Sequence, residues 1–109
     1  MIIELVRISP PVGKKEELLN GLASLVGPIQ VERGCLGCRL LQTVREGDGL
    51  LMESRWDSEE NLIRHLQSGT YKKMLLMMEL SAVPPDLEFF TVLELRGLDL
   101  VETARAPSN

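Results

Sequence analysis

The sequence lacks the features that mark membrane, secreted and nucleic-acid-binding proteins. Its apolar runs are broken by charges well short of the roughly 20 residues that cross a bilayer. Residues 1–4 contain no basic region and no cleavage site, so no secretory signal is predicted. The 12 Lys and Arg residues are scattered and the formal net charge is -4, whereas a nucleic-acid surface needs a basic stripe. We therefore expect a cytoplasmic protein that binds neither a membrane nor nucleic acid.

Histidine and cysteine are scarce as well. His65 is the single histidine, and Cys35 and Cys38 are the two cysteines, too few for the four ligands of a structural zinc. The odd cysteine spacing on a predicted strand turns the thiols to opposite faces, where they cannot form a disulfide. We expect ordinary, partly buried cysteines, no metal site and no cofactor. The alternative is thiol redox chemistry, in which replacing Cys38 by serine would abolish activity.

The 109 residues, of which 44% are hydrophobic, suit one domain with one core. Apolar periodicity and turn residues divide the chain into elements. Strands are predicted at residues 2–9, 35–45, 50–56 and 87–95, with a short extra strand at 98–102, and helical regions at 14–34 and 57–80. This order is the α+β, ferredoxin-like βαββαβ plan with an antiparallel sheet. The domain would span residues 1–103, followed by a polar tail at 104–109.

The first predicted helix contains two expected breakpoints. Its apolar stripe recurs at helical spacing and consists of Leu18, Leu22, Leu25 and Ile29. Pro28 removes an amide donor, so it is expected to kink the helix or to restart it as a second segment. Gly34 would then end the helical region as a left-handed cap residue.

The second helical region is predicted from its capping residues. Asp57 would cap the helix, with Glu60 three residues later at the spacing of a capping box. Gly69 would either interrupt this helix or lie within it. Before it, residues 46–49 would form the tight turn of a hairpin between two strands.

The predicted strands are apolar on both faces. One face contains Ile3, Leu5, Leu51 and Leu93, and the other contains Ile2, Val6, Leu50 and Val92. The helices cover only one face of such a sheet, and a bare apolar face would aggregate. We therefore expect a homodimer that packs sheet against sheet, in which residues 98–102 reach across to the partner.

A set of short motifs follows the predicted strands and helices in a defined order. The motifs are Gly34-Cys35-Leu36, Trp56-Asp57-Ser58-Glu59-Glu60, His65-Leu66-Gln67-Ser68 and Tyr71. Each motif is short, so their order and spacing are the specific part. Together they resemble the antibiotic biosynthesis monooxygenase (ABM) family, and the resemblance covers residues 1–95.

The resemblance implies a dimeric α/β barrel. Enzymes of the family oxidise aromatic polyketides or quinols with molecular oxygen and use no flavin or metal, while a sister group binds and degrades haem. An electron-rich phenolate can pass an electron to oxygen itself. The protein then needs only a dry pocket, a base and groups that stabilise the developing charges.

His65 and Trp56 are the expected catalytic residues. His65 has the side chain whose ordinary pKa suits a base near neutral pH, although a lone histidine beside an apolar stripe is also commonly structural. Trp56 resembles the pocket tryptophan of the family, whose indole N–H would hold a substrate oxygen; the alternative is a core aromatic.

Four residues are expected to bind a small aromatic ligand. Tyr71 would donate a hydrogen bond to a phenolic substrate, or pack over the helix break. Arg7 is a charge within a strand, for which a solvated edge or an ion pair is the alternative. Met52 and Met74 carry flexible thioethers that suit flat aromatic ligands, with core filling as the simplest interpretation.

Two departures limit the resemblance. The asparagine and the haem-ligating histidine of haem-degrading relatives correspond here to Val6 and Leu75, which cannot do that chemistry. The acidic residue often found two positions before the family tryptophan is Ser54 here. Glu53 is shifted by one residue and therefore lies on the other face of the strand.

The sequence thus predicts a small, cofactor-independent monooxygenase that oxidises an electron-rich aromatic, such as a quinol or polyphenol, with O2. A non-catalytic homodimer that binds a small ligand or has a regulatory role is the alternative, because one fold carries many functions.

Overall fold

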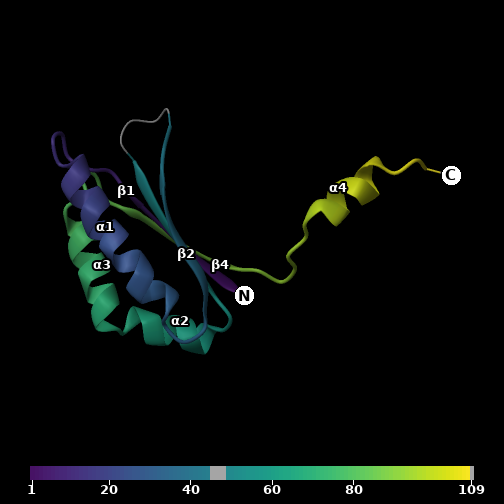
Figure 1. Cartoon of the computed structure of the whole chain (residues 1–109), viewed down its shortest axis with the longest axis horizontal. Helices are drawn as coiled ribbons and strands as arrows, with labels where there is room; N and C mark the ends of the chain where they lie inside the picture. Colours follow the sequence, from purple (N-terminus) through teal and green to yellow (C-terminus); the bar gives the residue numbers. More distant parts are fainter. Residues whose placement is uncertain (45–48, 109) are drawn as a thin grey trace.

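The computed structural model describes residues 1–44 and 49–108. Its elements follow the order β1 (Ile2–Ile8), α1 (Lys15–Gln30), β2 (Cys35–Gln42), β3 (Leu50–Trp56), α2 (Glu59–Leu66), α3 (Gly69–Glu79), β4 (Asp86–Thr91) and α4 (Leu98–Arg105). The strands form one antiparallel sheet in the order β2-β3-β1-β4. Helices α1, α2 and α3 cover one face of the sheet, and α4 stands apart from it (Figure 1). The predicted α+β, ferredoxin-like plan is confirmed.

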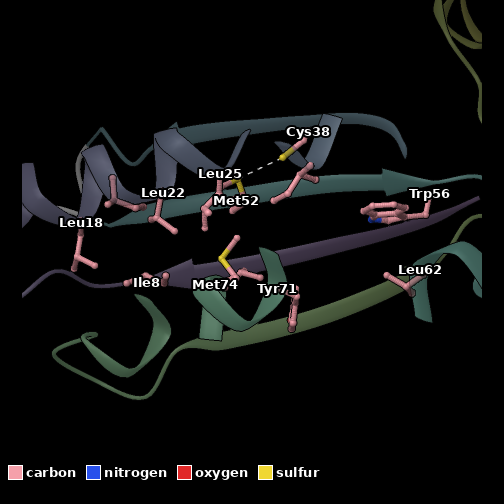
Figure 2. Packing of buried hydrophobic residues seen from close by; sticks show 13 residues of the cluster. Ile8, Leu18, Leu22, Leu25, Cys38, Met52, Trp56, Leu62, Tyr71 and Met74 are labelled. Atoms are coloured by element: carbon pink, nitrogen blue, oxygen red, sulfur yellow. Dashed lines mark hydrogen bonds between the residues drawn. The ribbon is translucent and has the colours of Figure 1, made fainter. Parts of the chain in front are cut away.

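The two central strands separate a covered sheet face from an open one. In β3, buried and partly exposed residues alternate strictly from Leu50 to Trp56, and β1 alternates in the same way from Glu4 to Ile8. Because successive residues of a strand point to opposite faces, the buried set is the one that faces the helices. Figure 2 shows this core between the helices and the sheet, with Met52, Trp56 and Met74 among its members.

Helix α1 buries the predicted stripe Leu18, Leu22, Leu25 and Ile29. It continues through Pro28 and ends at Gln30, so it does not restart as a second segment, and only Ile29 and Gln30 follow the proline within the helix. Gly34 has the expected positive φ of 81°, but it belongs to the turn before β2 rather than to the helix end. A Cβ at this position would also collide with the side chain of Asn61.

Two separate helices form the second helical region, and the break lies at Gln67 and Ser68, directly before Gly69. The cap of α2 is Ser58 rather than the predicted Asp57, because the Ser58 hydroxyl oxygen accepts the Asn61 backbone N–H. Asp57 instead accepts a 2.8 Å hydrogen bond from the side-chain amide of Asn61. Ser68 caps α3 by accepting the Tyr71 backbone N–H, which fixes where Tyr71 enters the core.

The C-terminal region differs most from the prediction. Residues 98–102, predicted as a short extra strand, belong to helix α4, so that prediction was wrong. Strand β4 ends at Thr91, and an extended segment leads from it to α4. No other part of the described chain covers α4 (Figure 1). Without a neighbouring strand to pair with, residues 98–102 satisfy their backbone groups locally, as a helix does. Helix α4 also runs past the predicted start of the tail at residue 104.

The hairpin between β2 and β3 is described only in part. Strand β2 ends at Gln42, and the Thr43 backbone N–H donates to the Gly49 carbonyl across the base of the connection. The predicted strand end at residue 45 and most of the predicted turn at 46–49 lie outside the described residues.

Candidate functional site

A polar and aromatic cluster lies inside the covered face, near the end of the sheet where β3 leads into α2. Five of its members are buried, and Glu32, in the α1–β2 connection, is partly buried. The members are Glu4, Glu32, Ser54, Trp56, His65 and Tyr71, and we call them the His65 cluster. Because a buried polar group is costly unless it has a partner, their mutual contacts define the site.

His65 is fully buried on α2, and its two ring nitrogens have different surroundings. Nδ1 lies 2.8 Å from Oε2 of Glu32, within hydrogen-bond distance. Nε2 has no hydrogen-bond partner among the described residues and lies 3.6 Å from Oε1 of Glu4. In the neutral ring, Glu32 therefore holds the proton on Nδ1 and leaves a lone pair on Nε2.

Glu4 supplies a second carboxylate from β1, where it pairs with Ser54 of β3. Its Oε2 accepts a 2.7 Å hydrogen bond from the Tyr71 hydroxyl, and its Oε1 accepts a 3.3 Å bond from the Ser54 hydroxyl. The Ser54 oxygen accepts the indole N–H of Trp56 at 2.9 Å. The indole donor expected to hold a substrate oxygen therefore already has a partner inside the cluster.

Aromatic packing restricts the orientation of the imidazole. The Trp56 and His65 rings stack with centroids 4.4 Å apart and an interplanar angle of 23°. Tyr71 meets His65 edge to face, with centroids 5.0 Å apart. An imidazolium over an indole face is also favoured by the quadrupole of the ring.

Electrostatics in the cluster favour the protonated form of His65. Burial by itself lowers the pKa of His65, but the Glu4 and Glu32 carboxylates outweigh burial, so the pKa is raised above its ordinary value. Burial, together with the charge of Glu4, raises the pKa of Tyr71, which therefore stays a hydrogen-bond donor. The cluster thus combines a basic imidazole with an oriented carboxylate, the arrangement found in general-base catalysis.

The structure brings together three of the predicted site residues and places the others elsewhere. Trp56, His65 and Tyr71 are members of the cluster. Met52 and Met74 are buried in the adjoining core, with Met52 in contact with the Cys38 thiol (Figure 2). Arg7 is exposed on the opposite face of the sheet.

Sequence reasoning missed both carboxylates. Glu4 interrupts the inward apolar positions Ile2, Val6 and Ile8 of β1, so a charged residue at a position expected to be buried was the available signal. Glu32 lies in a connection with no such pattern, and its contact with His65 spans 33 residues.

Clefts open on the surface of the described residues in at least three places. One of about 320 Å³, which we call the α2–β4 cleft, is lined by Ile2, Glu59, Leu62, Ile63, Leu66, Phe89 and Thr91. It adjoins the His65 cluster, because Ile2 pairs with Trp56 and Leu62 lies one helical turn before His65. The second, at the β2 edge, is lined by charged residues including Arg39 and Glu53, and the third lies beside Leu18 and Leu80.

The two cysteines face the same side of the sheet, contrary to the prediction. A β-bulge shifts the register between Cys35 and Gly37, so Cys35 pairs with Trp56 and Cys38 with Ser54. One extra residue in a strand reverses the alternation beyond it. Both thiols are free, and burial raises the pKa of Cys38 to about 12. A thiol that stays protonated is a poor nucleophile.

Residues 1–44 and 49–108 contain no group of three or more His, Cys, Asp and Glu side chains arranged to hold a metal ion. In the same part of the chain, no helix is both long and apolar enough to cross a membrane.

A family model described as antibiotic biosynthesis monooxygenase matches residues 1–75. No curated protein matches the chain in sequence. Among solved structures, Rv0793 from Mycobacterium tuberculosis superposes with a TM-score of 0.78 at 22% identity, covering 88% of this chain and 98% of its own. A Deinococcus radiodurans protein, provisionally described as an antibiotic biosynthesis monooxygenase, has a TM-score of 0.80 at 17% identity and coverages of 89% and 97%. At these identities the superpositions show a shared fold.

Proposed function

The chain belongs to the antibiotic biosynthesis monooxygenase family, and from this premise we propose that it oxidises an electron-rich aromatic with molecular oxygen, without flavin or metal. The substrate class is a quinol or polyphenol. The observation that carries this proposal is the buried imidazole of His65, held at Nδ1 by Glu32 and, among the described residues, unpaired at Nε2.

His65 acts as the base in this proposal. Its Nε2 accepts a phenolic proton, and Glu32 stabilises the imidazolium that forms. The resulting phenolate passes electrons to O2, and the positive ring beside Trp56 and Tyr71 stabilises the reduced oxygen. One oxygen atom enters the aromatic ring, and the other leaves as water with two hydrogen atoms of the substrate. The substrate supplies all four electrons, so no added reductant is required.

The α2–β4 cleft is the proposed entry for the aromatic ring. Its lining is largely apolar and includes the ring of Phe89, which suits a flat hydrophobic ligand. A substrate in this cleft would reach Nε2 of His65 by displacing Leu62, a buried residue of the cleft lining that lies one helical turn before His65 on α2. Met52 and Met74, in the core beside the cluster, would adapt to the ring by changing rotamer.

Oxygen uptake tests the proposal directly. Wild-type protein, treated with a chelator and free of flavin, is presented with a panel of hydroquinones and anthrones in an oxygen electrode. We expect turnover by the wild type and a loss of about 10²–10⁴-fold in kcat for His65→Gln. Glu60→Gln, an exposed change on the same helix, serves as the control and retains full activity. Uptake at background level for every substrate would refute the proposal.

A second candidate function, a non-catalytic ligand-binding or regulatory dimer, is favoured by the complete burial of Trp56 and His65. A thermal-shift screen with the same panel separates the two. Stabilisation by a compound that is never consumed favours the binding function, because a ligand stabilises the state it binds whether or not it reacts.

We also propose that the protein is a homodimer. Ile3, Leu5 and Leu51 are only partly buried on the open sheet face, where Phe90 is exposed. The C-terminal arm, residues 92–105, adds further exposed apolar side chains, namely Leu93, Leu95, Leu98, Leu100 and Val101. An isolated helix of 8 residues is marginal in water. A second copy of the chain, packed on the open face and contacted by the arm, would cover both surfaces.

A further inference from the structure

The His65 cluster contains more than a base and its orienting carboxylate. His65 lies between two carboxylates that come from distant parts of the chain, Glu32 on its Nδ1 side and Glu4 on its Nε2 side. Glu4 is almost completely buried, on the central strand β1. A buried carboxylate is costly and persists where its surroundings hold it in place.

Two hydrogen-bond donors other than His65 set the position of the Glu4 carboxylate. The hydroxyl groups of Tyr71 and Ser54 each donate to a different oxygen of the Glu4 carboxylate. The Ser54 hydroxyl is in turn oriented by the indole N–H of Trp56. Both oxygens are thus partnered, which leaves the carboxylate facing the imidazole at 3.6 Å, too far for a direct hydrogen bond.

We propose that Glu4 is a positioning residue for His65, which acts through its charge on the Nε2 side while Glu32 fixes the proton on Nδ1. At 3.6 Å the carboxylate stabilises the imidazolium without occupying the Nε2 lone pair. The base would thereby be strengthened and left open for a substrate proton. The consequence for activity rests on the proposed function, whereas the effect on His65 itself does not.

Glu4 and Ser54 are paired across strands β1 and β3, so a carboxylate at position 54 is expected to act on His65 as Glu4 does. Directly opposite residues of adjacent antiparallel strands have Cβ atoms about 5 Å apart and point to the same face. A carboxylate moved from position 4 to position 54 would still face Tyr71 and His65. The double variant Glu4→Ser with Ser54→Glu therefore keeps one glutamate and one serine in the pair and moves the carboxylate from β1 to β3.

The charges that act on His65 come from Glu4 on β1 and Glu32 in the α1–β2 connection. Tyr71 on α3 and Cys38 on β2 have raised pKa values and are neutral near pH 7. The titration midpoint of the imidazole therefore measures the effect of the two carboxylates, since Tyr71 and Cys38 do not change charge in the same pH range.

Nuclear magnetic resonance of the imidazole tests this inference without any substrate. His65 is the single histidine, so tag-free protein labelled with 15N-histidine gives the tautomer and titration midpoint of this residue alone. For Glu4→Gln we expect the wild-type tautomer and a midpoint lower by about one pH unit, a tenfold change in the protonation equilibrium. Glu32→Gln should change the tautomer. Glu88→Gln, an exposed carboxylate on the neighbouring strand β4, should change neither.

Rescue separates positioning from a merely structural role. The exchange of Glu4 and Ser54 should return the midpoint toward the wild-type value. Tyr71→Phe keeps Glu4 but removes one of its two hydroxyl donors, so the carboxylate should turn to the imidazole and raise the midpoint. This second variant remains informative even where Glu4→Gln does not fold. An unchanged midpoint in Glu4→Gln, or in Tyr71→Phe, overturns the inference. The spectra require no turnover, so a protein without oxygenase activity would still show whether Glu4 shifts the titration of His65.

Discussion

At the scale of single residues, the proposed chemistry depends on His65 and the groups around it. From the sequence, a structural role was the alternative for a lone histidine beside an apolar stripe. The structure places His65 between two carboxylates, and its Nε2 has no hydrogen-bond partner among the described residues. That arrangement has consequences for stability that are independent of any substrate.

Stability should fall as the pH rises through the pKa of His65. The folded-state pKa is raised, so protonation favours the folded protein. This stabilisation is fully present below the ordinary histidine pKa of about 6.5 and is lost as the pH passes the raised value. Urea unfolding followed by circular dichroism should show a midpoint that decreases over this range, and His65→Gln should lack the decrease. A wild-type midpoint that is flat over the same range would contradict the assignment.

The cysteines should be dispensable for activity. Burial raises the pKa of both thiols, so neither is a reactive thiolate near neutral pH. We expect Cys38→Ala to lose about 1 kcal/mol of stability, because it removes a buried side chain, and to keep kcat. Cys35→Ala, at a partly exposed site, should cost less. A folded Cys38→Ala protein without activity would instead favour the thiol redox alternative.

At the scale of elements, strand β4 contributes adjacent residues to two different proposed surfaces, the substrate cleft and the dimer interface. Phe89 and Phe90 are similarly exposed, at 45% and 44%, but they point to opposite faces of the strand. Phe89 lines the α2–β4 cleft, while Phe90 lies beside Ile3 on the open face. Each substitution therefore serves as the control for the other.

Phe89→Ala should raise KM about tenfold, equivalent to about 1.4 kcal/mol of binding free energy, and leave the dimer intact. Phe90→Ala should leave KM unchanged at protein concentrations where the dimer persists, and should weaken the dimer. Steady-state kinetics and sedimentation velocity on both variants provide the measurement. Equal effects of the two substitutions on KM would place the substrate outside the cleft.

At the scale of the whole molecule, the C-terminal arm determines the shape. The radius of gyration is 16.5 Å, larger than the roughly 13 Å of a 100-residue domain, because α4 extends away from the body (Figure 1). An arm with exposed leucines and no cover from the rest of the described chain is expected to bind a second copy of the protein.

Charge placed on α4 should therefore weaken association. Leu98 and Val101 lie one helical turn apart, so Leu98→Glu with Val101→Glu puts two charges on one face of the helix. We expect the dimer Kd to rise at least about tenfold, with the fold of residues 1–91 retained. Thr103→Glu adds charge on the same helix without removing an apolar contact and is the control. A monomeric wild type at micromolar concentration would refute the homodimer.

The order of elements from β1 to β4 and the inward stripe of α1 were predictable from local patterns. The apolar runs of the strands and the helical stripe of α1 depend on neighbouring residues alone. The same holds for the break next to Gly69 and for the spacing of Trp56, His65 and Tyr71, which indicated the family. These features are found in the folded protein as predicted, because they follow from the burial of apolar residues that the local pattern already identifies.

Tertiary structure alone decided the features that depend on distant contacts. Glu4 meets Tyr71 across 67 residues and Ser54 across 50, and no local pattern encodes either contact. The bulge at Cys35 and Gly37 brought both thiols to one face, because a register shift depends on the partner strand. Residues 98–102 became helix because no strand of the described chain lies beside them to pair with. The sequence by itself determined which surfaces are apolar, and the packing of the chain determined that two carboxylates flank one imidazole.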